Sequence, residues 1–272
     1  MVRQGKGQSK RLDIQHKLAG GPVGIFGAEA REHDAKVKDA VKVVLRSSEE
    51  YFPRLDFRHR DSITKKEIND KLQSIDKSLG KVLFVKNASI KPDGGILEVK
   101  DKHGVYRILL IGESKHQGND IQKIKHGIKQ GKDEESDLMV AGNAIERVHK
   151  NILEFRNYML EELHFPYVVF AQGSNFATET FFVKTPDGRK VKIAHDAGNM
   201  NRIDRVSASS FGKEINKNYC KNVFVELDGN TQMLQASSLY FKAHPWVLTE
   251  MVNILWENVK TSFEILSDDL EV

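Results

Sequence analysis

Two carboxylates and a lysine stand close together in KPDGGILEVKDKHGVYRILLIGESKHQG, residues 91–118. Glu113 and Lys115 lie two residues apart in a predicted strand, so their side chains point to the same face. If a hairpin turns near residues 102 and 103, paired residue numbers sum to about 205 or 206. Asp93 then lies opposite residues 112–113, and a bulge would shift that partner. The three polar groups are therefore expected to converge at the open end of a sheet.

This combination of groups is typical of metal-dependent phosphodiester hydrolysis. Neighbouring carboxylates stay ionised most easily around a hard cation, and Mg²⁺ prefers one or two carboxylates with water and phosphate oxygens. A lysine beside them can hold an attacking water or stabilise a developing negative charge. The alternative is a strand end with scattered surface charges. The apolar run RILLIG that leads into Glu113 favours catalysis, since buried strands often deliver catalytic groups at their ends.

The elements that must position these residues alternate between strands and helices, which favours a layered α/β fold. Helices are expected at about residues 28–46, 64–75, 144–163, 199–211 and 245–267, with Thr64 and Glu67 in capping-box spacing. Strands are expected at residues 82–87, 96–100, 105–115 and 166–172, and a hairpin at 181–193. We find neither an internal repeat nor a linker. A single domain spanning residues 1–272 is expected, with a flexible basic N-terminal arm of about residues 1–16.

The bulk composition fits a soluble globular protein that stays in the cell. Of the 272 residues, 39% are hydrophobic and 29% are charged, and no apolar run is long enough for a membrane span. The start of the chain, MVRQGKGQSKRLD, lacks the apolar core of a signal peptide. Cys220 is the only cysteine, which excludes an intrachain disulfide. The net charge of +4 permits a polyanionic partner without requiring one.

The stretch AGNAIERVHKN, residues 141–151, has two interpretations. As a helix start, it has Asn143 as N-cap and Glu146 three residues later, the spacing of a capping box. As a reader of DNA, Asn143 can pair with adenine, Glu146 can accept from an exocyclic amine and Arg147 can donate to a purine. Residues 139–142 would then lie as extended chain in the major groove. From these residues alone, capping is the more frequent role.

Six ordered segments carry a resemblance to a known family: SIKPDGG at 89–95, ESKHQG at 113–118, DLMVAGNAIERVHKNI at 137–152, HFPYV at 164–168, GSNF at 173–176 and NRIDR at 201–205. With them the chain resembles the EcoRI-type restriction endonucleases of the PD-(D/E)xK nuclease superfamily. The resemblance spans most of the chain and is weakest after about residue 220. It implies a PD-(D/E)xK restriction-endonuclease-like fold, a mixed central β-sheet flanked by helices.

The resemblance also implies an activity. It implies a bacterial, cytoplasmic type II restriction endonuclease that acts as a homodimer on a palindromic duplex and cuts both strands with Mg²⁺. Asp93 and Glu113 would hold the metal together with the backbone carbonyl of Ser114, and Lys115 would assist the attacking water. The products would carry 5′-phosphates and 3′-hydroxyls. A cognate adenine methyltransferase would act on the same site without needing to bind the protein.

The resemblance implies which residues contact DNA. The site expected is GAATTC, cut after the G, and AATT is its firmer part because Val140 stands where the family prototype has alanine. The base-recognition set is Met139, Val140, Asn143, Ala144, Glu146, Arg147, Arg202, Arg205 and Gln117. The backbone-contact set is Asn87, Lys91, Arg58 and Arg60, each of which could equally be an ordinary exposed polar residue. Arg202 and Arg205 could instead be helix-surface partners of Asp204.

Two other functions are consistent with parts of this pattern. A sequence-specific DNA-binding protein that does not cut would need a broken catalytic set, whereas Asp93, Glu113 and Lys115 are all present. A hydrolase of small phosphoesters would not need the basic segments and paired arginines. Because an Asn143 that caps a helix is poorly placed to read adenine, residues 139–147 are expected to be mobile or capped without DNA and ordered by it. His116 is interpreted as a packing or interface residue.

Overall fold

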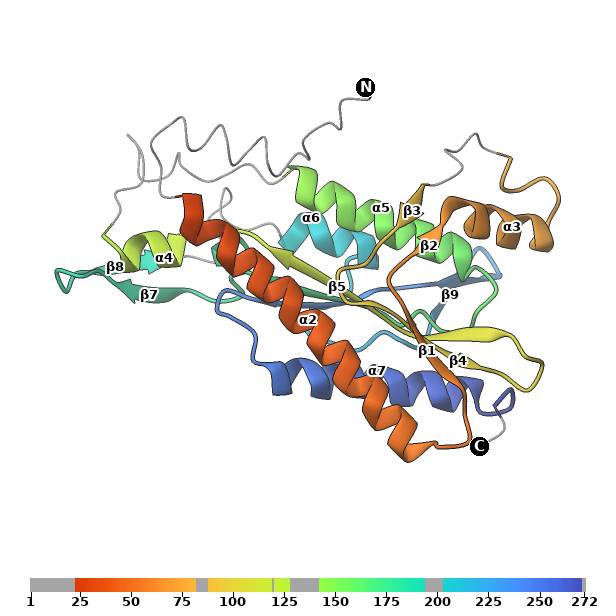
Figure 1. Ribbon diagram of the computed structural model, residues 1–272. Helices are drawn as coiled ribbons and strands as arrows, with labels where there is room; N and C mark the ends of the chain where they lie inside the picture. The colour runs from red at the N-terminus through yellow and green to blue at the C-terminus, as the bar shows by residue number, and fades with distance from the viewer. Residues whose placement is uncertain (1–22, 82–87, 119, 128–141, 194–202, 271–272) are drawn as a thin grey trace, which may run out of the picture.

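A five-stranded mixed sheet forms the central layer of the computed structural model, which describes residues 23–81, 88–118, 120–127, 142–193 and 203–270 (Figure 1). Its strands, in spatial order, are β1 (Phe57–Arg60), β4 (Gly95–Lys100), β5 (Tyr106–His116), β6 (Tyr167–Gln172) and β11 (Ser238–Lys242). The first three pair antiparallel and the last three pair parallel. The expected mixed sheet is confirmed, and the parallel strands bring their carboxyl ends to one edge.

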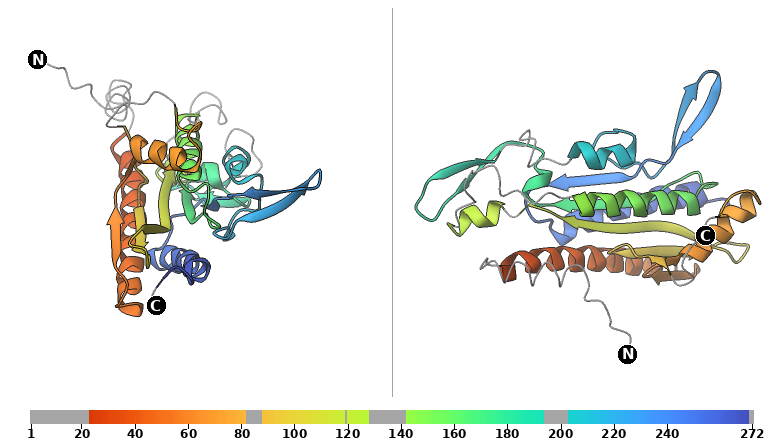
Figure 2. Two further views of the ribbon diagram at one scale, coloured as in Figure 1. Left: turned by 90° about the vertical axis from the view of Figure 1, so that its right-hand side faces the viewer. Right: turned by 90° about the horizontal axis from the view of Figure 1, so that it is seen from above.

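Helices cover both faces of the sheet (Figure 2). On one face, α2 (Val23–Tyr51) and α7 (Leu248–Leu266) pack on an apolar layer that includes Val41, Leu110 and Val168. On the other, the apolar layer is shared by α3 (Lys65–Ile75), α5 (Gly142–Tyr158) and α6 (Ile203–Ser207). The remaining helices are short: α4 (Asp120–Lys125) and the 3-10 turns η1 (Ser174–Phe176) and η2 (Ala208–Ser210).

Three small antiparallel pairs lie outside the central sheet. They are β2 (Ile63–Thr64) with β3 (Ser89–Ile90), β7 (Phe181–Lys184) with β8 (Lys190–Ile193), and β9 (Val223–Leu227) with β10 (Asn230–Leu234). The latter two hairpins project from the layered body (Figure 2). The β7–β8 turn is the expected one: Thr185 N–H donates to the Arg189 carbonyl, and Gly188 takes a positive φ of 89°.

Most expected elements are confirmed, with changed ends. Thr64 caps α3 and Glu67 completes the capping box. The expected helix at 28–46 is part of the longer α2. Helix α5 ends at Tyr158 rather than 163, because the chain turns there and inserts Phe165 beside Tyr167, with ring centroids 5.7 Å apart. The strand expected at 82–87 and residues 199–202 of the expected helix lie outside the described residues.

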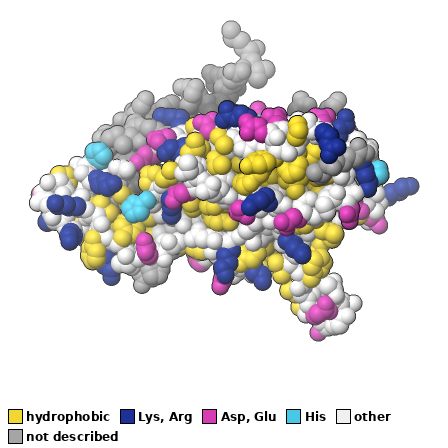
Figure 3. Space-filling model, turned by 90° about the horizontal axis from the view of Figure 1, so that it is seen from below, with side chains coloured by type: hydrophobic (Ala, Val, Ile, Leu, Met, Phe, Trp, Pro, Cys, Tyr) yellow, Lys and Arg dark blue, Asp and Glu magenta, His cyan; other side chains and the backbone are white. Residues whose placement is uncertain are grey.

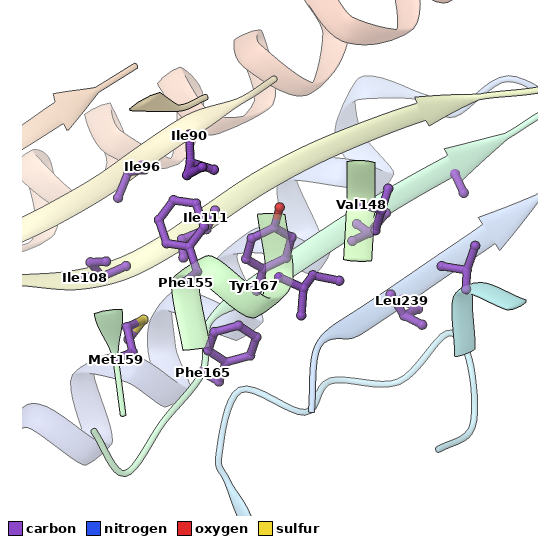
Figure 4. Packing of buried hydrophobic residues seen from close by; sticks show 14 of the residues in the cluster. Ile90, Ile96, Ile108, Ile111, Val148, Phe155, Met159, Phe165, Tyr167 and Leu239 are labelled. Atoms are coloured by element: carbon purple, nitrogen blue, oxygen red, sulfur yellow. The ribbon is translucent and has the colours of Figure 1, made fainter. Parts of the chain in front are cut away.

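The stripe predicted for α5 is buried against the sheet. Its members Ile145, Val148, Ile152, Phe155 and Met159 are all at most 6% exposed. Figure 4 shows the Phe155 ring beside Tyr167, and the centroids are 5.6 Å apart at an edge-on angle of 61°. Burial of each such side chain contributes about 1.5–3 kcal/mol. This packing fixes α5 on the same sheet face as the polar end of β5.

A β-bulge decides which residues of β5 face α5. Leu97 pairs with Leu110 but Glu98 pairs with Ile108, which leaves Leu109 as the extra residue. Leu109 and Leu110 both join the layer under α2, and Ile111 returns to the α5 side. Glu113 therefore shares the α5 side with Ile111. The register expected for Asp93 is off by one residue, because the bulge moves its partner from 112–113 to Ser114, whose N–H lies 3.3 Å from Asp93 Oδ2.

Two glycines let α2 approach the sheet closely. A Cβ atom added at Gly94 would lie 2.9 Å from Val37 Cγ1, and one at Gly112 would lie 2.9 Å from Val41 Cγ2. Gly94 N–H also donates to the Gly112 carbonyl at 2.9 Å, so the two glycines face each other across β4 and β5. Helix α2 therefore rests almost directly on the backbone of the strands that carry the carboxylates.

The face over α7 has mixed character. In Figure 3 hydrophobic side chains gather along its middle, with basic and acidic side chains interspersed among them. Val247 and Leu248, at the start of α7, are exposed. Because a DNA-binding surface needs clustered basic charge, the described part of this face offers no reason to place DNA here.

Among the helices in the described ranges, none combines the length and the apolarity needed to cross a lipid bilayer.

Protonation of a buried histidine on α2 is expected to lower the stability of the protein in acid. His33 is 1% exposed, its Nε2 donates to the Phe170 carbonyl at 2.9 Å, and burial lowers its pKa to about 4. The unfolded chain protonates this histidine near pH 6.5, whereas the folded protein protonates it only near pH 4. The stability that neutral His33 contributes is therefore present above pH 6.5 and is lost as the pH falls toward 4. We expect the free energy of unfolding to fall between pH 7.5 and 5, with His33 contributing about 2 kcal/mol of the loss.

Urea unfolding of wild type and His33→Gln at the two pH values measures this contribution. Glutamine keeps a donor for Phe170 and does not titrate, so the variant should lose about 2 kcal/mol less between the two pH values. An equal loss in both proteins would rule out the role of His33.

Candidate active site

Asp93, Glu113 and Lys115 converge at the carboxyl end of β5, as their spacing predicted. The Lys115 ammonium Nζ donates to Asp93 Oδ2 at 2.9 Å, to the Ser114 carbonyl at 2.5 Å and to Glu113 Oε1. Asp93 precedes β4, and the antiparallel β4–β5 pairing carries it to Ser114. Glu113 and Lys115 come from one side of β5. Two members of the cluster are therefore carried by β5 itself, and Asp93 is carried by the bend that leads into β4.

Lys115 and Glu113 each favour the charged form of the other. Glu113 is 1% exposed, and burial raises its pKa while Lys115 opposes that shift. Burial works to lower the pKa of Lys115, but Glu113 and Asp93 outweigh it and the net shift is upward. The second oxygen of Glu113, Oε2, accepts from the Tyr167 hydroxyl at 3.1 Å and from Asn151 Nδ2 at 3.4 Å. The ammonium, the tyrosine and the amide together hold the Glu113 carboxylate in one orientation.

The oxygen set fits a hard divalent cation. One positive group, the Lys115 ammonium, already lies where oxygens of Asp93, Glu113 and Ser114 converge. No group of three His, Cys, Asp or Glu that could hold a metal occurs within the described ranges. The donors are thus two carboxylates and one carbonyl, and water and phosphate oxygens would complete the shell that Mg²⁺ prefers.

Three residues near the cluster were missed by the sequence analysis: Asp34, Asn151 and Tyr167. Asp34 accepts a short hydrogen bond from the Ser114 hydroxyl. Burial raises the pKa of Asp34, and this hydrogen bond opposes the shift. A signal for Asp34 existed, because it stands three and seven residues before Val37 and Val41 and so interrupts the apolar stripe of α2. The spacing gave Asn151 and Tyr167 no role, since the packing of α5 on the sheet brings Asn151 to Glu113 and the pairing of β6 with β5 brings Tyr167 there.

The helix that carries the end of the predicted reading segment reaches this cluster through Asn151. Asn151 links α5 to Glu113, and Glu146 and Arg147 are exposed nearer the start of the helix. Helix α5 begins at Gly142, so Asn143 lies inside its first turn and the prediction of Asn143 as the N-cap is wrong. The side chains of Asn143 and Ala144 lie outside what the structure describes, as do Met139 and Val140.

The second predicted reading segment lies against the first. His149 Nε2 on α5 donates to the Arg205 carbonyl on α6 at 2.9 Å, and the Arg205 side chain is exposed. Figure 1 shows α5 and α6 side by side. Arg202 lies outside the described residues. Gln117, also predicted to read bases, is only 7% exposed, and its Oε1 is buried without a hydrogen-bond partner.

The predicted backbone contacts occupy different environments. Lys91 is exposed, two residues before Asp93. Arg58 and Arg60 on β1 both bind the fully buried Glu98, with Arg58 Nε 2.5 Å from Glu98 Oε2. The Arg58 guanidinium also lies 3.7 Å from the Tyr106 ring centroid. Asn87 lies outside the described residues.

His116 and a distant cavity are not part of the cluster. Burial lowers the pKa of His116 to about 4, so the imidazole is neutral near pH 7, and its Nε2 lies 3.5 Å from Glu29. A cavity of about 420 Å³ lies at the other end of β5, where Asp101, Arg107 and Glu162 are among its lining residues. The carboxylate cluster thus lies at the carboxyl end of the central strand β5, away from that cavity.

The fold and the acid–lysine cluster define a class, the metal-dependent nucleases with a restriction-endonuclease-like α/β fold. The family model described as restriction endonuclease EcoRI matches residues 19–272. The chain is 58% identical over 268 residues to the type II restriction enzyme RsrI of Cereibacter sphaeroides, covering 98% of this chain and 97% of that protein. It is 49% identical over 267 residues to the type II restriction enzyme EcoRI of Escherichia coli, covering 97% and 96%.

The chain belongs to the restriction endonuclease EcoRI family. The predicted resemblance and fold are confirmed. The chain is therefore a type II restriction endonuclease that cleaves double-stranded DNA at specific sites, within a family whose members generally depend on a metal ion.

Proposed function

We propose that this endonuclease acts as a homodimer on the palindrome GAATTC and uses Mg²⁺ to cut each strand after the G. The products would carry 5′-phosphates, 3′-hydroxyls and 5′ overhangs. The observation that carries the proposed metal-dependent cleavage is the convergence of Asp93, Glu113 and the Ser114 carbonyl on the Lys115 ammonium. Family membership supports the same conclusion independently.

In this proposal each residue of the cluster has a defined task. Asp93, Glu113 and the Ser114 carbonyl would hold the Mg²⁺ ion. When bound, the ion neutralises charge that develops on the scissile phosphate and strengthens water as a nucleophile. Lys115 holds the attacking water or stabilises the developing negative charge. Tyr167 and Asn151 keep the Glu113 carboxylate oriented.

We propose that α5 and α6 form the base-reading surface. Glu146, Arg147 and Arg205 supply its exposed side chains, and the contact between His149 and Arg205 keeps the two helices in register. Arg147 and Arg205 can donate to purine N7, and Glu146 can accept from exocyclic amines. The proposed set is completed by Met139, Val140, Asn143, Ala144, Arg202 and Gln117, and Lys91, Asn87, Arg58 and Arg60 are proposed for backbone contacts.

Symmetry supports the proposed dimer. A palindromic site presents the same half-site twice, and a two-fold dimer presents one cluster to each strand. We propose a single endonuclease domain over residues 1–272. A cognate adenine methyltransferase that acts on the same site would protect the host DNA from cleavage.

A plasmid with one GAATTC site should give a discrete linear product with Mg²⁺. The ends, read by run-off sequencing, should map the cut after the G on both strands. A matched plasmid with CAATTG tests the outer base pair, since AATT remains while the outer pair changes. Equal cleavage of both plasmids would contradict GAATTC and leave AATT as the recognised core. An intact GAATTC plasmid would contradict the proposed site altogether.

A further inference from the structure

A third carboxylate reaches the proposed metal site from the opposite side of the sheet. Asp34 lies on α2, one turn before Val37, whose Cγ1 would lie 2.9 Å from a Cβ added at Gly94. Because Gly94 and Gly112 let α2 rest on the strand backbone, Asp34 reaches Ser114, which points to the α2 side of β5. The Asp34 carboxylate is half-buried there and accepts the Ser114 hydroxyl in a short hydrogen bond.

The Ser114 hydroxyl has two carboxylate neighbours and one hydrogen to give. Its Oγ lies 3.2 Å from Asp93 Oδ2, the same oxygen that accepts from Lys115 and from the Ser114 N–H. A hydroxyl donates only one hydrogen. Asp93 Oδ2 already accepts from two other donors, so the hydrogen is directed to Asp34 and away from Asp93.

We propose that Asp34 is a positioning residue of the metal site, which captures the Ser114 hydroxyl hydrogen so that Asp93 Oδ2 stays available to a divalent cation. Without Asp34 the hydroxyl turns to Asp93 Oδ2 and competes with the cation for that oxygen. The backbone carbonyl of Ser114 is unaffected by this choice. The inference rests on the proposed function, in which Asp93 is a metal ligand.

The test measures binding of Mn²⁺ to the full chain by electron paramagnetic resonance, without DNA. We expect Asp34→Ala to weaken Mn²⁺ binding about tenfold, the lower end of the range for residues that hold metal ligands in place. Asp34→Asn keeps an oxygen that accepts from Ser114, so its affinity should stay within about threefold of wild type. Asp39→Ala is the matched control, because Asp39 is an exposed carboxylate on the same helix that pairs only with Lys42 at 3.6 Å among the ion pairs found in the described ranges.

A double variant separates hydrogen-bond capture from a simple charge effect. Ser114→Ala removes the competing hydroxyl, so adding Asp34→Ala to it should change Mn²⁺ affinity by less than about threefold. If Asp34 acted only through its charge, Asp34→Asn would bind as weakly as Asp34→Ala and Ser114→Ala would not rescue the loss. Either result would overturn the inference, as would wild-type affinity in Asp34→Ala. Thermal unfolding of each variant identifies one that fails to fold.

Asp93→Asn separates this inference from the proposed function. If Asp93→Asn weakens Mn²⁺ binding and Asp34→Ala does not, the metal site stands and the role of Asp34 is wrong. If Asp93→Asn leaves Mn²⁺ binding unchanged, the proposed metal site itself is wrong, and the role of Asp34 falls with it.

Discussion

Replacing Lys115 with methionine is expected to lower the rate of strand cleavage by about 10³-fold. Methionine keeps much of the side-chain volume but removes the ammonium that contacts Asp93, Glu113 and the Ser114 carbonyl. Specific DNA binding should remain, because the proposed reading surface on α5 and α6 is untouched. Single-turnover cleavage of a GAATTC duplex gives the rate, and a filter-binding or mobility-shift titration gives the affinity.

Lys66→Met provides the control for this substitution. Lys66 is an exposed lysine on α3 paired with Asp70, so its loss should leave both cleavage and binding near wild type. Cleavage by Lys115→Met within tenfold of wild type would remove Lys115 from the proposed chemistry. Loss of DNA binding together with cleavage would point to misfolding, which thermal unfolding detects directly.

Replacing Arg60 with alanine is expected to lower the free energy of unfolding. Arg60 pairs with Glu67 at 2.6 Å and with the fully buried Glu98 at 3.5 Å. Glu98 keeps Arg58 as a partner at 2.5 Å, so the loss should be about 2 kcal/mol, below the cost of leaving a buried charge entirely unpaired. Urea unfolding should show that loss. Arg189→Ala, which removes an exposed pair with Asp187, should cost less than about 1 kcal/mol.

The same variant also tests the predicted backbone contact of Arg60. Binding to DNA weakens with salt in proportion to the number of phosphates neutralised. If Arg60 makes the proposed backbone contact, Arg60→Ala should reduce the slope of log affinity against log salt by about one. An unchanged slope would contradict the proposed phosphate contact and leave Arg60 as a partner of Glu67 and Glu98 alone.

Local patterns predicted much of the fold and the centre of the site. The Glu-x-Lys spacing placed both side chains on one face, and the apolar stripe of α5 is buried as expected. The register of Asp93 was off by one, because the bulge at Leu109 depends on packing under α2 rather than on local sequence. The start of α5 differed for a similar reason, since local capping preferences do not fix a helix end.

Residues contributed by distant elements could not be predicted. Asp34 lies 80 positions before Ser114, Asn151 meets Glu113 through the packing of α5 on the sheet, and Tyr167 meets it through the pairing of β6 with β5. Such contacts follow from three-dimensional packing, and no spacing rule relates their sequence positions. The one accessible signal, a carboxylate within an apolar helical stripe, marked Asp34 as unusual without naming its partner.

Because of Gly94 and Gly112, the two faces of the sheet differ in how much sequence change they tolerate. Any side chain at either position would push α2 outward, and with it Asp34. The face of the sheet covered by α2 therefore tolerates little change at these positions. The α5 and α6 side carries exposed Glu146, Arg147 and Arg205, which can change without disturbing the strands beneath. Selection for a new recognition sequence should therefore collect substitutions on α5 and α6 and leave the contact of α2 with the two glycines intact.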